Sequence, residues 1–590
     1  MQTVSQNVNT RPLGALSRIK YNLFIAVFCI ATITLMDLAY YQFVNSNYVF
    51  KVSSLFQISY LFTCVLIFAA TFAGKIFYRS FITIIFAMSV FQIINFEYFG
   101  SYILPIHYIQ LAPDFLLIMS SLFEATGEMI PVLLMAGVVV VLIIAVLVPM
   151  SRHRIVVTRA AWFVVIILGC DFAGNYMFIS VNKEKLGEPS YLRLFPDINR
   201  LGVDNAYRSA RYLTVGILPD KLSGKSPDYP ALPEPVALSS PDVNIIVILN
   251  ETVRAESLSV LGYERKTTPR LDQIEDLYAS SIYSSGTMTR TSFAGLINRL
   301  KYPGIGTQFL SQSNCLFRLA KKNGFKTHFH YSHDRDVADT LLPLMSSKSI
   351  DSIRVSTDAP PEMRSFDDSL AYHLEQIDYD DRNFIVIGPS GAHSPYAEKS
   401  PEAFKKFGDE YHNAIHYTDH VVGGLIEQLR QHSTKPTYVM MTSDHGELLK
   451  GEGMRRGHGW FKNEVFNVPF LFLPINAPDP ADTMSEVRKV QSHFDMATLV
   501  LRLMGYDLAV QDASEKEIFI NGSDLSGLAG QLRLEFQDHE LQSVELINGM
   551  GTAPDLDEVR IDRMRPGSPD VTGSLAATSN AFDRPTASSQ

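Results

Sequence analysis

Cysteine is scarce in this chain of 590 residues, which contains only 4. Cys29, Cys64 and Cys170 fall in apolar segments of the first 180 residues, so Cys315 is the only cysteine in the rest of the chain. A single cysteine cannot form an internal disulfide, and we therefore expect this later part to be held together by its hydrophobic core. A metal site built from clustered cysteines is excluded for the same reason.

An excess of positive charge is also lacking, because 51 Lys and Arg residues stand against 61 Asp and Glu residues, a net charge of -10. With no basic cluster and no aromatic stacking platform, the sequence excludes a nucleic-acid partner. The first twenty residues are polar and lack the short apolar region and small-residue cleavage site of a removable signal peptide. We expect the first apolar segment to remain as a membrane anchor.

Long apolar segments nearly free of charge are concentrated in the first 180 residues. Each is close to the roughly 20 apolar residues that are needed to cross the hydrocarbon core of a membrane. Several such segments in succession rarely occur in soluble proteins, so we predict an α-helical membrane domain of five transmembrane helices over residues 1–180. The predicted spans are Tyr21–Val44, Ser54–Phe77, Phe81–Gly100, Pro131–Met150 and Ala160–Ile179.

The distribution of Lys and Arg predicts how these helices are oriented. Basic residues precede the first span and lie between the second and third spans and between the fourth and fifth, whereas residues 103–130 contain none. Connections rich in Lys and Arg stay in the cytoplasm. We therefore expect a cytoplasmic N-terminus and, after an odd number of spans, export of everything that follows Ser180.

Two segments of the exported part are expected to lie outside its core. Residues 181–242 contain many prolines, which suits a linker that runs along the membrane surface. Residues 551–590 are rich in Ser, Thr, Ala, Asp, Gly and Pro and have little apolar periodicity, which predicts a disordered C-terminal tail.

Residues 243–530 have the pattern of an α/β domain with a mostly parallel central sheet. Continuous apolar runs fit strands that are buried on both faces, and helical patterns such as Tyr411–Gln431 lie between them. The four runs are 243–249, 384–387, 438–441 and 470–473.

Polar residues follow three of these runs directly. They are Asn250-Glu251-Thr252, Gly391-Ala392-His393 and Ser443-Asp444-His445-Gly446-Glu447. Ligands of open α/β sheets bind at the carboxyl ends of the strands. We expect the three clusters to meet at one edge of the sheet.

Asp444 and His445 offer a carboxylate and an imidazole to a divalent ion, and Gly446 permits close approach of the backbone. Glu251 is a third candidate ligand, since a buried carboxylate without a partner is costly. His393 and His458 add two accessory imidazoles. This set of oxygen and nitrogen donors predicts zinc (Zn2+) rather than magnesium or calcium.

A nucleophile is sought in Ser285–Ser292, which carries several hydroxyls just before an apolar helix that starts at Phe293. A hydroxyl at a helix N-terminus can bind a metal as an alkoxide, while the helix dipole and the backbone N–H groups hold an anionic phosphate. An ordinary Ser/Thr helix cap is the alternative reading.

Four segments, in this order, closely resemble motifs of the bacterial inner-membrane phosphoethanolamine transferases, which belong to the alkaline phosphatase and sulfatase superfamily. They are Asn250–Glu256, Leu261–Pro269, Ser285–Thr289 and Ser443–Glu447. The resemblance covers nearly the whole chain, because that family also has five spans followed by an exported hydrolase-like domain. It implies an inner-membrane enzyme with a periplasmic catalytic domain.

The resemblance also implies roles for individual residues. Thr289 is expected to be the nucleophile, His393 and His458 are expected to contact the phosphate or a second zinc, and Glu128 is a candidate partner for the ammonium group of the donor lipid. It is equally probable that Glu128 is only an acid that faces water at the membrane interface. Asp37, Glu97 and Asp171, near span ends, are similar candidates for contact with the lipid. The implied zinc ligands are Glu251, Thr289, Asp444 and His445.

The implied reaction moves phosphoethanolamine from phosphatidylethanolamine to lipid A, a core sugar or another envelope glycan, through a covalent intermediate on Thr289. The chain departs from the lipid A-modifying members, which have a cysteine in place of Ser285 and several disulfides, and it has Asn250 where a glycine is expected. The alternatives are a glycerophosphate transferase that uses phosphatidylglycerol, a sulfatase-like phosphodiesterase and a catalytically silent membrane sensor. The formylglycine motif of sulfatases is absent around Thr289. The sequence defines no oligomeric state.

Overall fold

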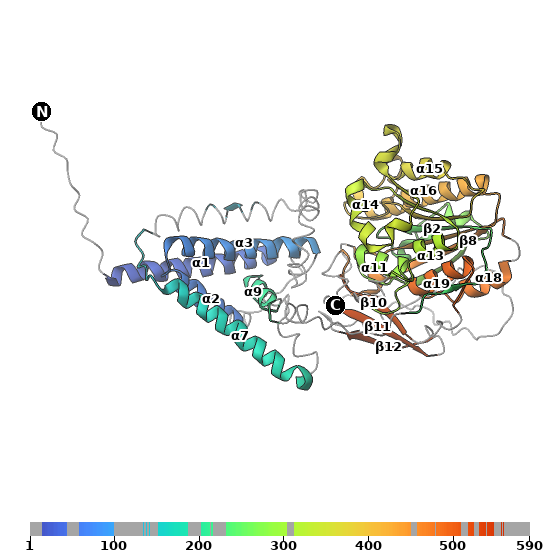
Figure 1. Cartoon of the computed structure of the whole chain (residues 1–590). Coiled ribbons are helices and arrows are strands. Elements are labelled where there is room, and N and C mark those ends of the chain that lie inside the picture. Colours follow the sequence, from blue (N-terminus) through green and yellow to red (C-terminus); the bar gives the residue numbers. More distant parts are fainter. Residues whose placement is uncertain are drawn as a thin grey trace, which may run out of the picture.

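The computed structural model shows a bundle of helices followed by an α/β domain (Figure 1). The predicted fourth span, Pro131–Met150, and the predicted tail, 551–590, lie almost entirely outside the residues that the structure describes. These residues are 15–43, 58–99, 134, 137, 138, 141, 152–186, 202–212, 214, 215, 232–303, 312–449, 457–477, 480–508, 517–523, 530–537, 540–547, 556 and 559.

The described part of the bundle contains three helices that are long and apolar enough to cross a membrane, over Ala15–Leu38, Lys75–Ile94 and Ala160–Met177. A shorter apolar helix covers Tyr60–Ala70. The helices that contain these segments are α1 (Ala15–Phe43), α2 (Ile58–Ala70), α3 (Lys75–Phe99) and α7 (Ala160–Leu186).

The predicted second span, Ser54–Phe77, extends too far. Helix α2 ends at Ala70, and α3 begins at Lys75 after a short turn, six residues before the predicted start at Phe81. The Arg154 guanidinium donates hydrogen bonds to the carbonyls of Thr71 and Ala73, both at 2.6 Å. These bonds satisfy backbone groups that the turn leaves free, so the chain breaks its helix inside an apolar run that composition alone cannot divide.

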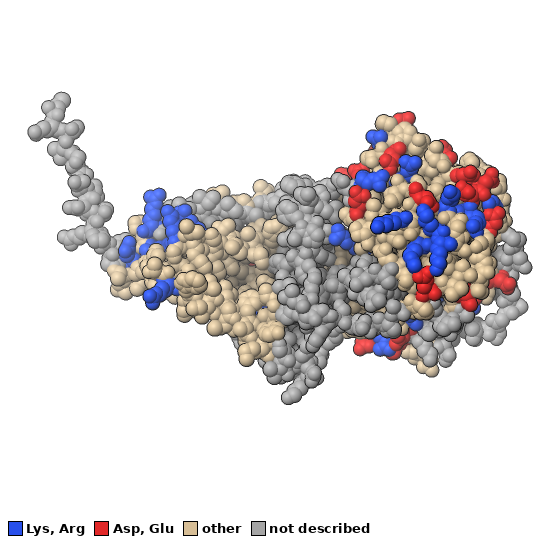
Figure 2. Space-filling model, viewed as in Figure 1, with Lys and Arg blue, Asp and Glu red and all other residues tan. Residues whose placement is uncertain are grey.

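Basic side chains gather at one end of the bundle, the end away from the α/β domain (Figure 2). The starts of α1 and α3 and the residues just before α7 supply them, and the rings of Tyr21 and His153 lie 5.2 Å apart between two of these segments. The basic residues counted in the sequence therefore share one end of the bundle.

A short helix that follows α7 in the sequence packs back onto the bundle. Helix α9 (Gly202–Tyr212) contacts α2 and α3. Asp37 of α1 accepts the backbone N–H of Gly202 at 2.7 Å, and Asp171 of α7 accepts the Tyr207 hydroxyl at 2.6 Å. Two carboxylates of the bundle thus hold both halves of α9.

The α/β domain is built on a seven-stranded sheet in the order β3-β8-β7-β2-β6-β4-β5. The five strands from β7 to β5 are parallel, whereas β8 is antiparallel to both β7 and β3. The strands are β2 (Asn244–Asn250), β3 (Tyr278–Tyr283), β4 (Lys326–Tyr331), β5 (Ser352–Val355), β6 (Asn383–Gly388), β7 (Thr437–Ser443) and β8 (Asn467–Ile475).

The four predicted apolar runs all form strands, but the sheet is mixed and the run at 470–473 lies in the antiparallel strand β8. A strand buried on both faces is apolar throughout whichever way it runs, so the sequence pattern does not encode its direction.

Helices cover both faces of the sheet. In β2, Ile245 and Val247 pack with one layer, whereas Ile246 and Ile248 pack with the other, as the two-residue period of a strand requires. The first layer holds α11 (Thr289–Ile297), α13 (Leu316–Lys322), α14 (Arg335–Leu341) and α19 (His493–Leu503), and the second holds α15 (Asp368–Glu375) and α16 (Glu410–His432).

A second, antiparallel sheet packs beside the first and continues past residue 530, where the sequence pattern weakens. Its apolar face contacts Tyr283 and Phe466 next to the end of β3. Its strands are β10 (Glu517–Asn521), β11 (Gln531–Gln537) and β12 (Glu540–Ile547). The remaining strands and α-helices of the described residues are β1 (Val236–Ala237), paired with β9 (Tyr506–Asp507), and the helices α17 (Asn463–Phe466) and α18 (Pro480–Val487).

Candidate active site

The parallel pairing of β2 and β7 brings two acids together. Asn250 lies opposite Ser443 in the ladder, so Glu251 and Asp444 leave the sheet side by side. The backbone N–H of Asp444 donates to the Asn250 carbonyl, and Asp444 Oδ1 accepts the N–H of Thr252, each at 2.9 Å. The two strands therefore fix the Asp444 carboxylate before any ligand binds.

His445 presents one ring nitrogen to these acids. Its Nδ1–H donates to the Gly446 carbonyl at 2.9 Å, which leaves Nε2 as an acceptor. Nε2 lies 3.3 Å from Asp444 Oδ2 and 3.7 Å from Glu251 Oε1. One ligand atom from each of the three residues lies within 4.8 Å of the others, which is a geometry that can hold a metal ion.

Thr289 is the first residue of α11, and its side chain faces the same group. The Thr289 hydroxyl donates to Glu251 Oε1 at 3.0 Å and lies 3.3 Å from His445 Nε2. Other hydroxyls of the predicted nucleophile segment bond to the backbone instead: Ser285 to the Ser292 carbonyl and Thr291 to the Met288 carbonyl. The structure thus brings Thr289 to the predicted metal ligands.

The electrostatics of this buried group suit a cation. Burial and the adjacent Asp444 raise the pKa of Glu251 well above its usual value. Burial opposes ionisation of Asp444 too, but His445 and the N–H of Thr252 hold the pKa of Asp444 below its usual value. Among the described residues, Asp444 Oδ2 is buried without a hydrogen-bond partner. Two carboxylates and a free imidazole nitrogen therefore fit a divalent metal of the zinc type.

His458 and His393 lie beside the group. The ring of His458 is 4.3 Å from that of His445 and 5.7 Å from that of His393, between centroids. His458 Nδ1 lies 3.2 Å from Glu447 Oε2, and this carboxylate outweighs burial and raises the pKa of His458. Burial lowers the pKa of His393 to about 3.

The loop that carries His393 packs directly on Glu251. The Ala392 N–H donates to the Glu251 carbonyl at 3.0 Å, and Gly391 adopts a φ of +57°. A Cβ on Gly391 would lie 2.3 Å from that carbonyl oxygen. Glycine is needed here for both its conformation and its small size.

All six predicted residues of the α/β domain thus gather at the carboxyl ends of β2, β6 and β7 and at the start of α11. Glu128 lies outside the described residues. Asp37 and Asp171, which the sequence also suggested as lipid contacts, hold α9.

Two residues that contact the site were given no role by the sequence interpretation. Glu447 belongs to the motif Ser443–Glu447, and its position two residues after His445 was the signal that could have identified it. His493 carries no local signal, because only the folded chain brings α19 behind the loop that precedes Thr289.

Residues 243–506 match the family model described as Sulfatase. The α/β domain, with its acids and histidines at the carboxyl ends of the strands, is therefore a sulfatase-like domain.

Comparison with curated proteins identifies the relatives. The chain is 25% identical over 303 residues to the Kdo(2)-lipid A phosphoethanolamine 7''-transferase of Escherichia coli (strain K12). This match covers 45% of this chain and 52% of that protein. It is also 24% identical over 231 residues to phosphoethanolamine transferase EptA of the same strain, and this match covers 35% of this chain and 42% of that protein. The chain spans about half the length of these relatives. The resemblance to phosphoethanolamine transferases that the motifs indicate is confirmed.

A solved structure is similar in fold over both regions of the chain. The integral membrane protein lipooligosaccharide phosphoethanolamine transferase A (EptA) from Neisseria meningitidis matches with a TM-score of 0.51 and 16% identity, over 84% of this chain and 97% of that one. Membrane helices followed by a sulfatase-like domain are therefore a fold that the two chains have in common.

Proposed function

We propose that this protein is a zinc-dependent phosphoethanolamine transferase that takes the headgroup from phosphatidylethanolamine and passes it to an envelope glycolipid or glycan through a covalent intermediate on Thr289. The observation that carries the proposal is the position of the Thr289 hydroxyl, 3.0 Å from Glu251 Oε1 and 3.3 Å from His445 Nε2. A nucleophile in contact with a metal-binding acid and imidazole is suited to attack on phosphorus.

Glu251, Asp444, His445 and Thr289 would hold the metal. A bound zinc ion supplies a Lewis acid that lowers the pKa of the threonine hydroxyl and takes up charge on the phosphoryl oxygens. The start of α11 adds the positive end of a helix dipole on the same side as Thr289.

In the first step, Thr289 Oγ attacks the phosphorus of the donor, and the bond from phosphorus to the diacylglycerol oxygen breaks. The Thr289 proton passes to Glu251, which already accepts it in a hydrogen bond. His458, whose pKa Glu447 raises, gives its proton to the departing alkoxide, and diacylglycerol leaves as an alcohol.

In the second step, the now neutral His458 takes the proton of an acceptor hydroxyl or phosphate, and the acceptor oxygen attacks the same phosphorus. The bond between phosphorus and Thr289 Oγ breaks, and Thr289 recovers its proton from Glu251. His458 is protonated again, so each residue returns to its initial state.

The membrane helices support a lipid donor, because they would hold the α/β domain close to the headgroups. The name of the E. coli relative supports an acceptor of the lipid A type, and core sugars and periplasmic glycans share the required hydroxyl or phosphate. We further propose that the bundle lies in a bacterial inner membrane with the N-terminus in the cytoplasm and the α/β domain in the periplasm, in keeping with the basic end of the bundle.

The test uses the full chain in lipid nanodiscs with headgroup-labelled phosphatidylethanolamine, followed by mass spectrometry of the peptide that contains Thr289. We expect label on Thr289 and release of diacylglycerol, with both lost in Thr289→Ala and after chelation of zinc. Thr289→Ser keeps a hydroxyl and is the matched control, which should form the adduct.

A parallel reaction with labelled phosphatidylglycerol separates the donors. Adduct formation from phosphatidylglycerol alone would overturn the ethanolamine assignment, and water-dependent release of label without transfer would indicate a phosphodiesterase. No adduct from either lipid on a zinc-loaded protein would refute the transferase mechanism.

A further inference from the structure

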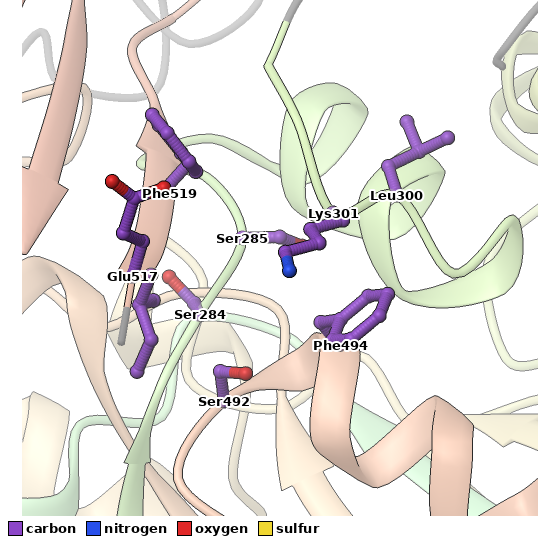
Figure 3. A pocket seen from close by; sticks show the side chains of 9 residues that line it. Ser284, Ser285, Leu300, Lys301, Ser492, Phe494, Glu517 and Phe519 are labelled. Atoms are coloured by element: carbon purple, nitrogen blue, oxygen red, sulfur yellow. The ribbon is translucent and has the colours of Figure 1, made fainter. Parts of the chain in front are cut away.

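His493 lies behind the loop that leads to the nucleophile. It is the first residue of α19 and is fully buried. Figure 3 shows its two chain neighbours, Ser492 and Phe494, lining a pocket together with Ser284 and Ser285 of that loop. The imidazole therefore sits where the loop, α19 and the end of β7 meet.

One ring nitrogen binds the end of β7. His493 Nε2 lies 3.1 Å from the Ser443 carbonyl oxygen and 3.3 Å from Thr442 Oγ1. A carbonyl oxygen only accepts, so Nε2 carries the proton. Ser443 is the residue directly before Asp444, and this bond holds the backbone from which the metal ligands project.

The other ring nitrogen binds the nucleophile loop. With the proton on Nε2, His493 Nδ1 is an acceptor, and it takes the backbone N–H of Ser285 at 3.3 Å. Nδ1 also lies 3.3 Å from Ser292 Oγ, and Ser292 belongs to the first turn of α11 together with Thr289. The imidazole thus bridges the strand of the ligands and the helix of the nucleophile.

Two further contacts join α11 to the end of β7 and to the loop before α11. The Ser292 hydroxyl donates a hydrogen bond to the backbone carbonyl of Asp444. Gly295 of α11 allows Ser285 to pack against the helix, since a Cβ there would lie 2.1 Å from Ser285 Oγ. Ser292 therefore ties the first turn of α11 directly to Asp444. His493 ties the loop before α11 to Ser443, the residue before Asp444.

We propose that His493 is a positioning residue for group transfer, which sets the location of the Thr289 hydroxyl relative to Asp444 and His445. The inference rests on the proposed function for its catalytic meaning. His493 touches neither the ligand atoms nor the Thr289 hydroxyl, and it acts through Ser285, Ser292 and Ser443.

The ring stays in one protonation state while it does so. Burial lowers the pKa of His493 to about 4, so the neutral form with Nε2–H persists throughout the neutral range. A neutral imidazole has one donor and one acceptor, which are the two functions that the flanking backbone groups require.

The experiment compares three substitutions. His493→Phe keeps an aromatic ring but removes both polar atoms, His493→Gln keeps a donor near the Nε2 position, and His493→Asn keeps an acceptor near the Nδ1 position. His432→Phe, on the exposed end of α16, is the matched control.

For His493→Phe we expect a roughly 10²-fold loss of kcat for phospho-threonine formation, because misplacement of a nucleophile by about 1 Å costs that much in rate. The KM for phosphatidylethanolamine should stay within about twofold of the wild-type value, because the residues that bind the donor are unchanged. Zinc affinity, from competition with a chelator, should fall by about 10-fold, as for other residues that orient ligands. The Gln and Asn variants should each recover part of both losses, and His432→Phe should change neither.

An unchanged kcat in a folded His493→Phe would overturn the proposal, as would a loss confined to KM. If His493→Phe does not fold, the Gln and Asn variants decide: kcat and zinc affinity equal to those of the wild type in both would refute the positioning role. If the wild-type protein forms no adduct, the proposed function fails, and the chelator titration still reports whether His493 fixes the metal ligands.

Discussion

His458 Nδ1 lies 3.2 Å from Glu447 Oε2, and this contact makes His458 the basic member of a group of histidines whose other members are kept neutral. Burial lowers the pKa of both His393 and His445. In the proposed mechanism, His458 is therefore the histidine that donates and accepts protons.

The pH dependence of the first step should follow His458. A raised pKa keeps the imidazole protonated to higher pH, so single-turnover formation of the Thr289 adduct should fall as the pH rises through that pKa. The rate should also fall at low pH, where Glu251 is protonated and cannot accept the Thr289 proton. Glu447→Gln removes the carboxylate that raises the pKa, and the fall should then begin at a lower pH. Rapid-quench measurements across the pH range test this.

His458→Ala should lose about 10²–10⁴-fold in the same step, which is the usual contribution of a general acid. Its pH profile should be flat in the range where the wild-type rate falls. If the pH profile of Glu447→Gln is not shifted, the fall in rate with rising pH belongs to a group other than His458.

Glu251→Gln should have opposite effects on the metal-free and metal-bound forms. The raised pKa of Glu251 means that its charge destabilises the metal-free fold, and this cost grows as the pH rises above the pKa of the unfolded chain. At neutral pH the chelated variant should therefore unfold at a higher temperature than the chelated wild type. Added zinc at 100 times its Kd should stabilise the wild type by about 2.7 kcal/mol and the variant by less.

Thermal unfolding with chelator and with zinc provides the four curves for this comparison. Glu402→Gln, whose side chain is exposed, is the control and should leave all differences unchanged. A chelated Glu251→Gln that is less stable than the chelated wild type would contradict the prediction.

Gly391→Ala should damage the site through the backbone. The added Cβ meets the Glu251 carbonyl, and the φ of +57° disfavours any side chain. We expect a loss of about 1–3 kcal/mol in unfolding free energy, as for other overpacked positions, together with weaker zinc binding. Gly408→Ala, which has open space around its Cβ position, should change neither quantity in denaturant melts or chelator titrations.

Asp171→Ala should loosen α9 from the bundle. Loss of the bond from the Tyr207 hydroxyl removes about 0.5–1.5 kcal/mol of local stability, so backbone amides of α9 should exchange faster with deuterium. Met177→Ala changes an exposed side chain of the same helix, α7, and serves as the control. Unchanged exchange in Asp171→Ala would show that α9 is held by its other contacts.

The sequence predicted those parts of the fold and site that depend on neighbouring residues. Glu251 and Asp444 were identifiable because each follows a buried strand directly, and parallel strands end at one edge. Thr289 could not be separated from the other hydroxyls of its segment by pattern alone. The resemblance singled it out, and the structure places its hydroxyl in a hydrogen bond to Glu251. Its role as the nucleophile stays a prediction.

Features that depend on contacts between distant segments of the chain could not be predicted from the sequence. The direction of β8, the packing of β10–β12 beside Tyr283 and the return of α9 to the bundle all join segments far apart in the chain. The role of His493 is of the same kind, since its ring contacts residues about 50 and 200 positions away along the chain.

The buried position of Cys315 has a practical consequence. Its sulfur accepts the backbone N–H of Ser346 inside the core, and no other cysteine follows residue 180. The α/β domain therefore needs no oxidative folding, and a cysteine introduced on its surface would be the one thiol of that domain open to a fluorophore or spin label. Distances from such a label to the membrane surface can then be followed during turnover without first removing native cysteines from the domain.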